Sequence, residues 1–138
     1  MTDHGLVSII TQSYNSAQFI AQTMNSILAQ TYTHWELLIM DDCSTDDTCS
    51  IVKRYAENDK RIKLLRLSTN QGAAMARNSS IKRAQGRYIA LCDSDDCWYP
   101  DKLDKQLAFM TDRDYAFSYT SYKTSDESGE HTGIVICQ

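Results

Sequence analysis

The feature that most constrains the fold of this chain is an apolar run that ends abruptly in acidic residues. Residues 88–92 are mostly bulky and apolar, and Asp93, Asp95 and Asp96 follow them within four positions. The run has the length of a β-strand buried on both faces, and such a strand cannot continue through three carboxylates. We therefore expect the acids at its C-terminal end, where open α/β sheets bind their ligands.

The spacing of these acids indicates what they could bind. Alternate residues of an extended chain point the same way, so Asp93 and Asp95 can converge on one point. Adjacent carboxylates repel each other, and a hard cation such as Mg²⁺ or Mn²⁺ removes that cost. The pair therefore favours metal or phosphate chemistry over a plain polar loop, whereas Asp96 is expected to cap the next helix.

The rest of the chain alternates between strand and helix patterns. Strands are expected at residues 6–10, 35–40, 61–67 and 88–92. Four helices are expected between and after them: the first at 17–30, the second after the start signal of Ser44, Thr45 and Asp47, the third at 73–85, where Gly86 ends it, and the fourth after Pro100. Four alternations predict a parallel sheet with right-handed crossovers, which is an α/β fold of the nucleotide-binding type. Further along, we expect a strand at 115–122, a polar hairpin-like loop at 123–133 and a last strand at 134–137.

Composition limits the function classes. A chain of 138 residues with 42% hydrophobic and 23% charged residues is expected to form one domain with a real core, and a net charge of −4 gives no sign of nucleic-acid affinity. No apolar run reaches membrane-spanning length, the N-terminus lacks the basic start of a signal peptide, and the five cysteines show no metal-binding spacing. A cytoplasmic protein is therefore expected.

Other strand ends also carry candidate binding residues. Asp41 and Asp42 follow the second strand, and Tyr14 follows the first, where its ring could stack on a base or pack in the interior. Arg77 lies one turn inside the third helix and could bind a diphosphate in a fork geometry or form a surface ion pair. Neither a GxGxxG nor a GxxxxGK[ST] sequence is present, so the common nucleotide-binding loops have no local signature.

Several motifs in order resemble the family 2 glycosyltransferases, which are GT-A enzymes that move a sugar from a nucleotide donor. The likeness runs from about residue 6 to 137 and is carried by Val7-Ser8-Ile9-Ile10, Tyr14-Asn15, Ile27-Leu28-Ala29-Gln30-Thr31-Tyr32, residues 35–46 with Asp41-Asp42, Asn70-Gln71-Gly72, Ala76-Arg77-Asn78 and residues 88–96 with Trp98 and Pro100. The resemblance implies a Rossmann-like, mostly parallel sheet flanked by helices. Because the chain stops inside an apparent strand, we expect that domain to be incomplete at its C-terminal side.

The resemblance also implies a role for particular residues. Gln12, Ser13 and Tyr14 would line the base pocket, and Asp42 would accept a hydrogen bond from the base or ribose. Arg77 would lie near the nucleotide. Asp93-Ser94-Asp95 would be the DXD motif, in which Asp95 ligates Mn²⁺ or Mg²⁺ and Asp93 holds the ribose or a metal-bound water. The family's catalytic base would lie beyond Gln138, so no residue of this chain is assigned as base. Cys43 stands where glycine is common in the family, and a proline usual before Tyr14 is absent.

The implied reaction is sugar transfer, with inversion, from a nucleoside-diphosphate sugar to a saccharide or lipid-linked acceptor during synthesis of cell-surface polysaccharide. UDP-sugars are the favoured donors, and the resemblance leaves open peripheral association with the inner face of the membrane and homo-oligomer formation. Two alternatives remain: a non-catalytic nucleotide-binding fragment, and a phosphatase of the haloacid-dehalogenase type. The phosphatase fits less well because three expected strands precede the DXD motif and only residues 97–138 follow it.

Overall fold

The structure is a computed structural model that describes residues 2–135. Its internal contacts divide the chain into two compact units, residues 1–105 and residues 106–138, and each is described by itself.

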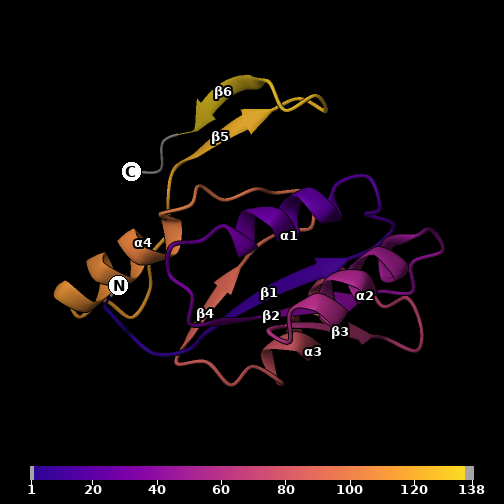
Figure 1. Cartoon of the computed structure of the whole chain (residues 1–138), viewed down its shortest axis with the longest axis horizontal. Coiled ribbons are helices and arrows are strands. Elements are labelled where there is room, and N and C mark those ends of the chain that lie inside the picture. The colour runs from indigo at the N-terminus through magenta and orange to yellow at the C-terminus, as the bar shows by residue number, and fades with distance from the viewer. Residues whose placement is uncertain (1, 136–138) are drawn as a thin grey trace. The chain divides into compact units, whose positions relative to one another are not determined.

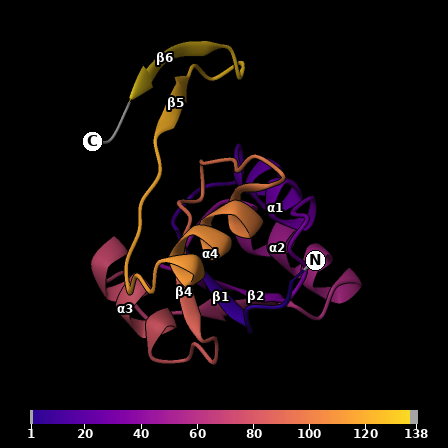
Figure 2. The same cartoon turned by 90° about the vertical axis from the view of Figure 1, so that its left-hand side faces the viewer.

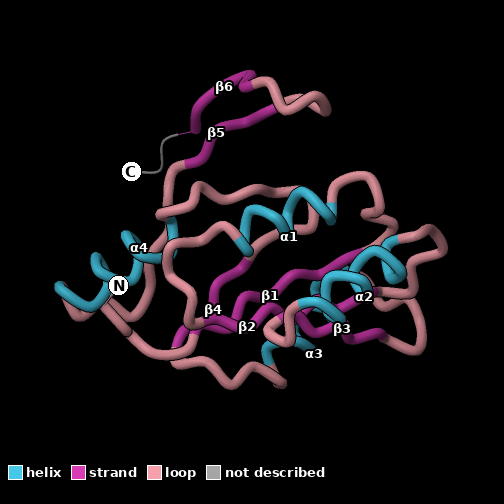
Figure 3. Tube along the Cα trace, in the orientation of Figure 1, coloured by secondary structure: helices cyan, strands magenta, loops and turns pink. Residues whose placement is uncertain are grey.

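The first unit is built on a four-stranded parallel sheet (Figures 1 and 3). Its strands are β1 (Val7–Ser13), β2 (Trp35–Asp41), β3 (Ile62–Arg66) and β4 (Tyr88–Leu91), in the order β3-β2-β1-β4. β1 and β2 pair from Val7 with Trp35 to Ser13 with Asp41, so their C-terminal ends lie at the same edge. The predicted parallel α/β sheet is therefore confirmed.

Helices cover this sheet. They are α1 (Ile20–Leu28), α2 (Thr48–Asn58) and α3 (Ala73–Ile81), and Figure 2 shows α1 and α2 together on the same side of β1 and β2. α3 packs against β1 and β2 and belongs to the crossover that returns the chain from β3 to β4. The core consists of β2, whose seven residues are all buried, the apolar residues of β1, and Ile20, Met24 and Ile27 of α1.

The position of β4 corrects one expectation. This strand lies at the edge of the sheet and pairs only with β1 among the described residues. Its exposed residues alternate, so one of its faces is open and it is not buried on both faces as the apolar run predicted. The side chains of Ile89 and Leu91 are 48% and 54% exposed. A run of apolar residues shows that a strand can be buried, but the elements that pack on each face of the sheet decide whether it is.

The ends of the helices differ from the expected ones in ways that the local contacts explain. α1 begins at Ile20 because residues 17–19 form a turn. α2 begins directly after Asp47, as the expected start signal predicts, and the Asp46 carboxylate accepts hydrogen bonds from both the backbone and the hydroxyl of Thr48. α3 ends at Ile81, well before Gly86. Gly86 is instead required by close packing, since a Cβ there would lie 2.5 Å from the Ser8 backbone nitrogen.

The end of the chain corrects a second expectation. α4 (Lys102–Asp112) begins two residues after Pro100, close to the predicted start. No strand forms over 115–121, and the antiparallel hairpin is made by β5 (Tyr122–Ser125) and β6 (His131–Val135), which fall largely in the expected loop. The alternating aromatic residues that suggested a strand, Tyr115, Phe117 and Tyr119, have exposed side chains. The expected strand at 134–137 lies partly outside the described residues.

Candidate functional site

The candidate site lies where β1, β2 and β4 end, at the C-terminal edge of the parallel sheet. Three residues predicted from the sequence meet there. The Gln12 side-chain amide donates a hydrogen bond of 2.6 Å to Asp93 Oδ1, and Arg77 Nη2 lies 3.5 Å from the same oxygen. β1, α3 and the loop after β4 therefore converge on one carboxylate, which leaves Asp93 Oδ2 available to a ligand.

The three acids form a cluster beside this contact. Asp93, Asp95 and Asp96 are exposed, and one carboxylate oxygen of each lies within 4.8 Å of the others. No group within residues 2–135 donates a hydrogen bond to the carboxylates of Asp95 or Asp96. Unpaired carboxylate oxygens at this spacing match the hard-ligand preference of Mg²⁺ and Mn²⁺, so the residues present fit such an ion.

Asp96 does not cap the next helix, which corrects the expectation from the sequence. α4 starts six residues further on, at Lys102, and the Asp96 backbone nitrogen closes a turn by donating to the Asp93 carbonyl at 3.1 Å. Partial desolvation of its carboxyl group raises the pKa of Asp96, although the residue is exposed, and the negative charges of Asp95 and Asp93 raise the pKa further. The negative charges of the three carboxylates in this loop therefore repel one another, and the loop does not compensate that repulsion.

Asp42 is buried and supports the loop that leads into α3. Its two carboxylate oxygens accept hydrogen bonds from the backbone nitrogens of Gln71, at 2.7 Å, and Gly72, at 2.8 Å. Gly72 has a φ of 89°, in the left-handed region that favours glycine. Asp42 thus sets the start of the helix that carries Arg77, and its remaining lone pairs can still accept a hydrogen bond from a ligand.

The residues at the end of β1 divide into one exposed and one buried side chain. Tyr14 is 52% exposed, so its ring is available for stacking. Ser13 is buried within β1, and its backbone carbonyl accepts a hydrogen bond of 2.8 Å from the Asp42 nitrogen.

Cys43 has a φ of 63°, which explains why glycine suits that position.

The structure adds contacts that sequence reasoning missed. Ser94, the middle residue of the DXD motif, forms hydrogen bonds with Ser16 at 2.8 Å and with Thr23 at 3.0 Å. Nothing in a single sequence pairs these positions, which are separated by more than seventy residues. The polar positions 23, 26 and 30, spaced by three and four residues along one helix, are the only available signal.

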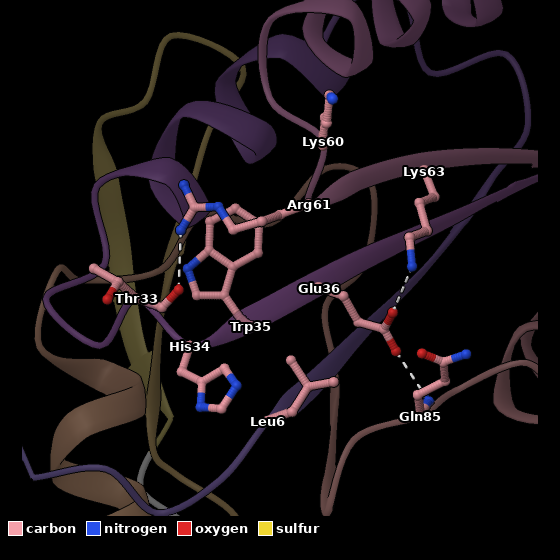
Figure 4. A pocket seen from close by; sticks show the side chains of 9 residues that line it. All are labelled: Leu6, Thr33, His34, Trp35, Glu36, Lys60, Arg61, Lys63 and Gln85. Carbon is pink, nitrogen blue, oxygen red and sulfur yellow. Dashed lines mark hydrogen bonds and ion pairs between the residues drawn. The ribbon is translucent and has the colours of Figure 1, made fainter.

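A separate hollow of about 360 Å³ lies at the opposite, N-terminal edge of the sheet (Figure 4). Trp35 and Glu36 of β2 line it together with Arg61, whose guanidinium lies 3.8 Å from the centre of the Trp35 ring. Glu36 and Arg61 are already engaged in hydrogen bonds within the protein. The hollow is remote from the acid cluster, and its polar groups serve the fold.

Comparison with known proteins places the chain in a family. The sequence profile of "Glycosyl transferase family 2" matches residues 8–134. The chain therefore belongs to the family 2 glycosyltransferases, as its motifs predicted.

Two bacterial relatives illustrate the similarity of this chain to named glycosyltransferases. It is 52% identical over 124 residues to "Putative teichuronic acid biosynthesis glycosyltransferase TuaG" of Bacillus subtilis, covering 90% of this chain and 49% of that protein. It is 46% identical over 121 residues to "UDP-Glc:alpha-D-GlcNAc-diphosphoundecaprenol beta-1,3-glucosyltransferase WfgD" of Escherichia coli, covering 88% of this chain and 47% of the relative. The chain thus spans about half the length of these relatives.

Solved structures share the fold. TarS 1-349 of S. aureus, solved in complex with UDP, superposes with a TM-score of 0.72 at 34% identity and covers 77% of this chain and 32% of that one. The mannosyltransferase PcManGT from Pyrobaculum calidifontis, solved with GDP-Man and Mn²⁺, gives a TM-score of 0.73 at 29% identity over 79% of this chain and 33% of that one. The predicted GT-A fold is therefore confirmed. Within residues 2–135, no helix is both long and apolar enough to cross a membrane.

Proposed function

We propose that this chain binds the donor of a glycosyltransferase that moves a sugar from a UDP-sugar to a lipid-linked saccharide during cell-surface polysaccharide synthesis. The observation that carries the proposal is the convergence of Gln12 and Arg77 on Asp93, beside the unpaired carboxylate of Asp95. An arginine next to open carboxylates can serve a diphosphate and its cation together. Residues 1–138 would act as one nucleotide-sugar-binding domain.

The proposed roles follow from the surroundings of each side chain. Tyr14 stacks on the base, because its ring is half exposed at the end of β1. Asp42, Ser13 and Gln12 shape the base and ribose side of the site, with Asp42 holding the 70–72 loop and Gln12 orienting Asp93. Arg77 Nη2 lies 3.5 Å from Asp93 Oδ1, a long distance for an ion pair, so the guanidinium can reorient toward a diphosphate oxygen.

Asp95, with Asp93, would hold Mn²⁺ or Mg²⁺, and the ion would neutralise the charge that develops on the diphosphate leaving group. Inversion requires a base that removes the proton of the acceptor hydroxyl during in-line attack, and no residue of this chain is assigned to that step. The chain's own part is to bind the donor and to orient its diphosphate.

The choice of donor and acceptor rests on the relatives. Structures of TarS contain UDP and UDP-GlcNAc, and the name of WfgD specifies a UDP-glucose donor and a diphosphoundecaprenol-linked acceptor. With a lipid-linked acceptor, the enzyme would act at the inner face of the membrane, where peripheral association would bring the site to its substrate. Self-association through the open edge strand β4 is a further part of the proposal.

The test combines a panel of nucleotides with a transfer assay. UDP, GDP and TDP are titrated into the chain with Mn²⁺, and labelled UDP-sugars are then offered with polyprenyl-diphosphate-linked and free saccharides, with WfgD as positive control. We expect UDP to bind most tightly and label to reach the lipid-linked acceptor very slowly or not at all, because no residue of this chain is assigned as the base. Release of inorganic phosphate from phosphate esters without nucleotide binding would support the phosphatase alternative instead.

A further inference from the structure

The loop that carries the acids takes its backbone hydrogen bonds from α1. Between β4 and α4 the chain forms no strand or helix, so its polar backbone groups need other partners. Four of them find partners in or next to α1: the carbonyls of Ser94, Tyr99 and Pro100 and the nitrogen of Trp98. The nitrogen of Leu103, in the first turn of α4, also donates to a residue next to α1.

The first of these contacts lies inside the DXD motif. The buried Thr23 hydroxyl donates to the Ser94 carbonyl at 3.0 Å, and the Ser94 hydroxyl lies 2.8 Å from the hydroxyl of the buried Ser16. Ser94 is thus held by its backbone and by its side chain. Because it separates Asp93 from Asp95, the positions of both carboxylates depend on it.

The other contacts fix the far end of the loop. Gln30 is 3% exposed, and its side-chain amide donates to the Tyr99 carbonyl at 2.7 Å and accepts from the Leu103 nitrogen at 3.1 Å. The Ser26 hydroxyl accepts from the Trp98 nitrogen at 3.1 Å. Thr23 and Ser26 of α1 and Gln30, which lies two residues after the end of that helix, therefore all hold this loop, and we call these three the anchoring residues.

This anchoring has a consequence for cation binding. Three like charges within 4.8 Å push the loop toward open conformations, and every such conformation lowers the affinity for an ion that needs the carboxylates together. A site that is held in the binding geometry avoids this cost. We propose that the anchoring residues, and Thr23 above all, are positioning residues that set the divalent-cation affinity of the Asp93–Asp95 pair; this inference rests on the proposed function.

The experiment measures Mn²⁺ affinity by the loss of the free-ion electron paramagnetic resonance signal, in the whole chain with saturating UDP, relative to the loss caused by the same UDP without protein. Thr23→Val removes the hydroxyl and keeps the shape, Thr23→Ser restores the donor, and Thr31→Val is the matched control at an exposed threonine. Gln30→Met and its control Gln22→Met, at an exposed position of α1, repeat the comparison at the far end of the loop. Thermal unfolding identifies any variant that fails to fold.

We expect Thr23→Val to weaken Mn²⁺ binding about 10-fold or more, on the scale of outer contacts in metal sites. Thr23→Ser and Thr31→Val should stay within about 2-fold of the unchanged chain, and Gln30→Met should lose more affinity than Gln22→Met. Folded Thr23→Val and Gln30→Met variants that bind Mn²⁺ like the unchanged chain would overturn the inference and leave the proposed function intact. An unchanged chain that binds no Mn²⁺ with UDP would overturn the proposed function itself.

Discussion

Glu36, at the N-terminal end of the parallel sheet, and Asp95 and Asp96, at its C-terminal end, have opposite surroundings. At the N-terminal end, Glu36 is 5% exposed and accepts hydrogen bonds from the Ser8 hydroxyl at 2.6 Å, the Gln85 nitrogen at 3.0 Å and the Lys63 ammonium at 2.9 Å. At the C-terminal end, Asp95 and Asp96 are exposed and accept none from residues 2–135. The charge of Glu36 is satisfied by the fold, whereas the charges of Asp95 and Asp96 are left unpaired.

The pKa shifts report the same difference. Burial pushes the pKa of Glu36 upward, but the hydrogen bonds from Ser8, Gln85 and Lys63 together outweigh it, so the pKa is lowered. Burial and neighbouring charges raise the pKa of Asp96. A carboxylate that the fold stabilises is expected to serve structure, whereas carboxylates that the fold destabilises are expected to serve a ligand.

The largest expected effect comes from Asp95→Asn. A neutral amide oxygen is a poor replacement for a carboxylate beside a diphosphate, so Mn²⁺-dependent UDP binding should fall by at least about 100-fold. Unfolding temperature should hardly change, because Asp95 makes no hydrogen bond that supports the described fold. Titration calorimetry measures the binding, and Asp96→Asn is the matched control. Equal losses in the two variants would show that the wrong carboxylate is assigned.

The second-largest effect is expected from Glu36→Gln, which should lower the free energy of unfolding and leave UDP binding unchanged. The amide cannot accept from Ser8, Gln85 and Lys63 as the carboxylate does, and an unsatisfied buried group costs about 1–3 kcal/mol of the free energy of unfolding. Denaturant unfolding at pH 7 measures the loss. Unchanged stability together with weakened UDP binding would reverse the proposed roles of the two ends.

The same variant gives a pH test with a definite sign. Because the folded state lowers the pKa of Glu36 below its ordinary value of 4.5, its contribution to stability is complete above that value and is lost as the pH falls through the lower, folded pKa. The unchanged chain should therefore exceed Glu36→Gln in stability at pH 7, and the difference should shrink below about pH 4.5. A difference that grows on acidification would contradict the assignment.

Tyr14→Ala tests whether a second residue at the C-terminal end of the sheet serves binding and not stability. Loss of one base–aromatic stack should weaken UDP binding by about 1–3 kcal/mol, whereas the half-exposed ring contributes little to the core. Calorimetric titration and thermal unfolding of the same sample separate the two effects. A stability loss with unchanged UDP affinity would return Tyr14 to a packing role.

The smallest expected effect is a gain. The raised pKa of Asp96 means that its charge costs folding free energy above that pKa, so Asp96→Asn should stabilise the metal-free chain at pH 7 by about 0.5 kcal/mol. The gain should disappear as the pH falls, because the aspartate then becomes neutral as well. Calorimetric unfolding at pH 7 and pH 4 measures both. Destabilisation at pH 7 would show that the Asp96 charge supports the fold.

Much of the first unit could be predicted because its local patterns agree with its fold. The strands at 35–40 and 61–67 and the acids after two strands were correctly placed from apolar runs and their ends. The exposed faces of β4 could not be predicted, since a strand's sequence does not contain its place in the sheet. The failure at 115–122 has a related cause, because alternation alone cannot distinguish a half-buried strand from exposed aromatic residues.

The sequence predicted which residues belong to the candidate site better than it predicted the contacts between them. The motifs identified Gln12, Arg77 and Asp93, but not that the first two meet on one oxygen of the third. The support of Ser94 by Thr23 joins two elements that are distant in sequence, so only the folded chain reveals it. The assignment of these residues to nucleotide and metal stays a prediction until binding is measured.

The most direct test of the unpaired charge at the C-terminal end is the affinity of the unchanged chain for UDP with Mn²⁺ and with EDTA. If Asp93 and Asp95 hold a cation that bridges to the diphosphate, UDP should bind at least about 100-fold more tightly with Mn²⁺, because without it the carboxylates repel the nucleotide. Equal UDP affinity in the two titrations, or no UDP binding in either, would contradict the assignment of this end of the sheet to the donor.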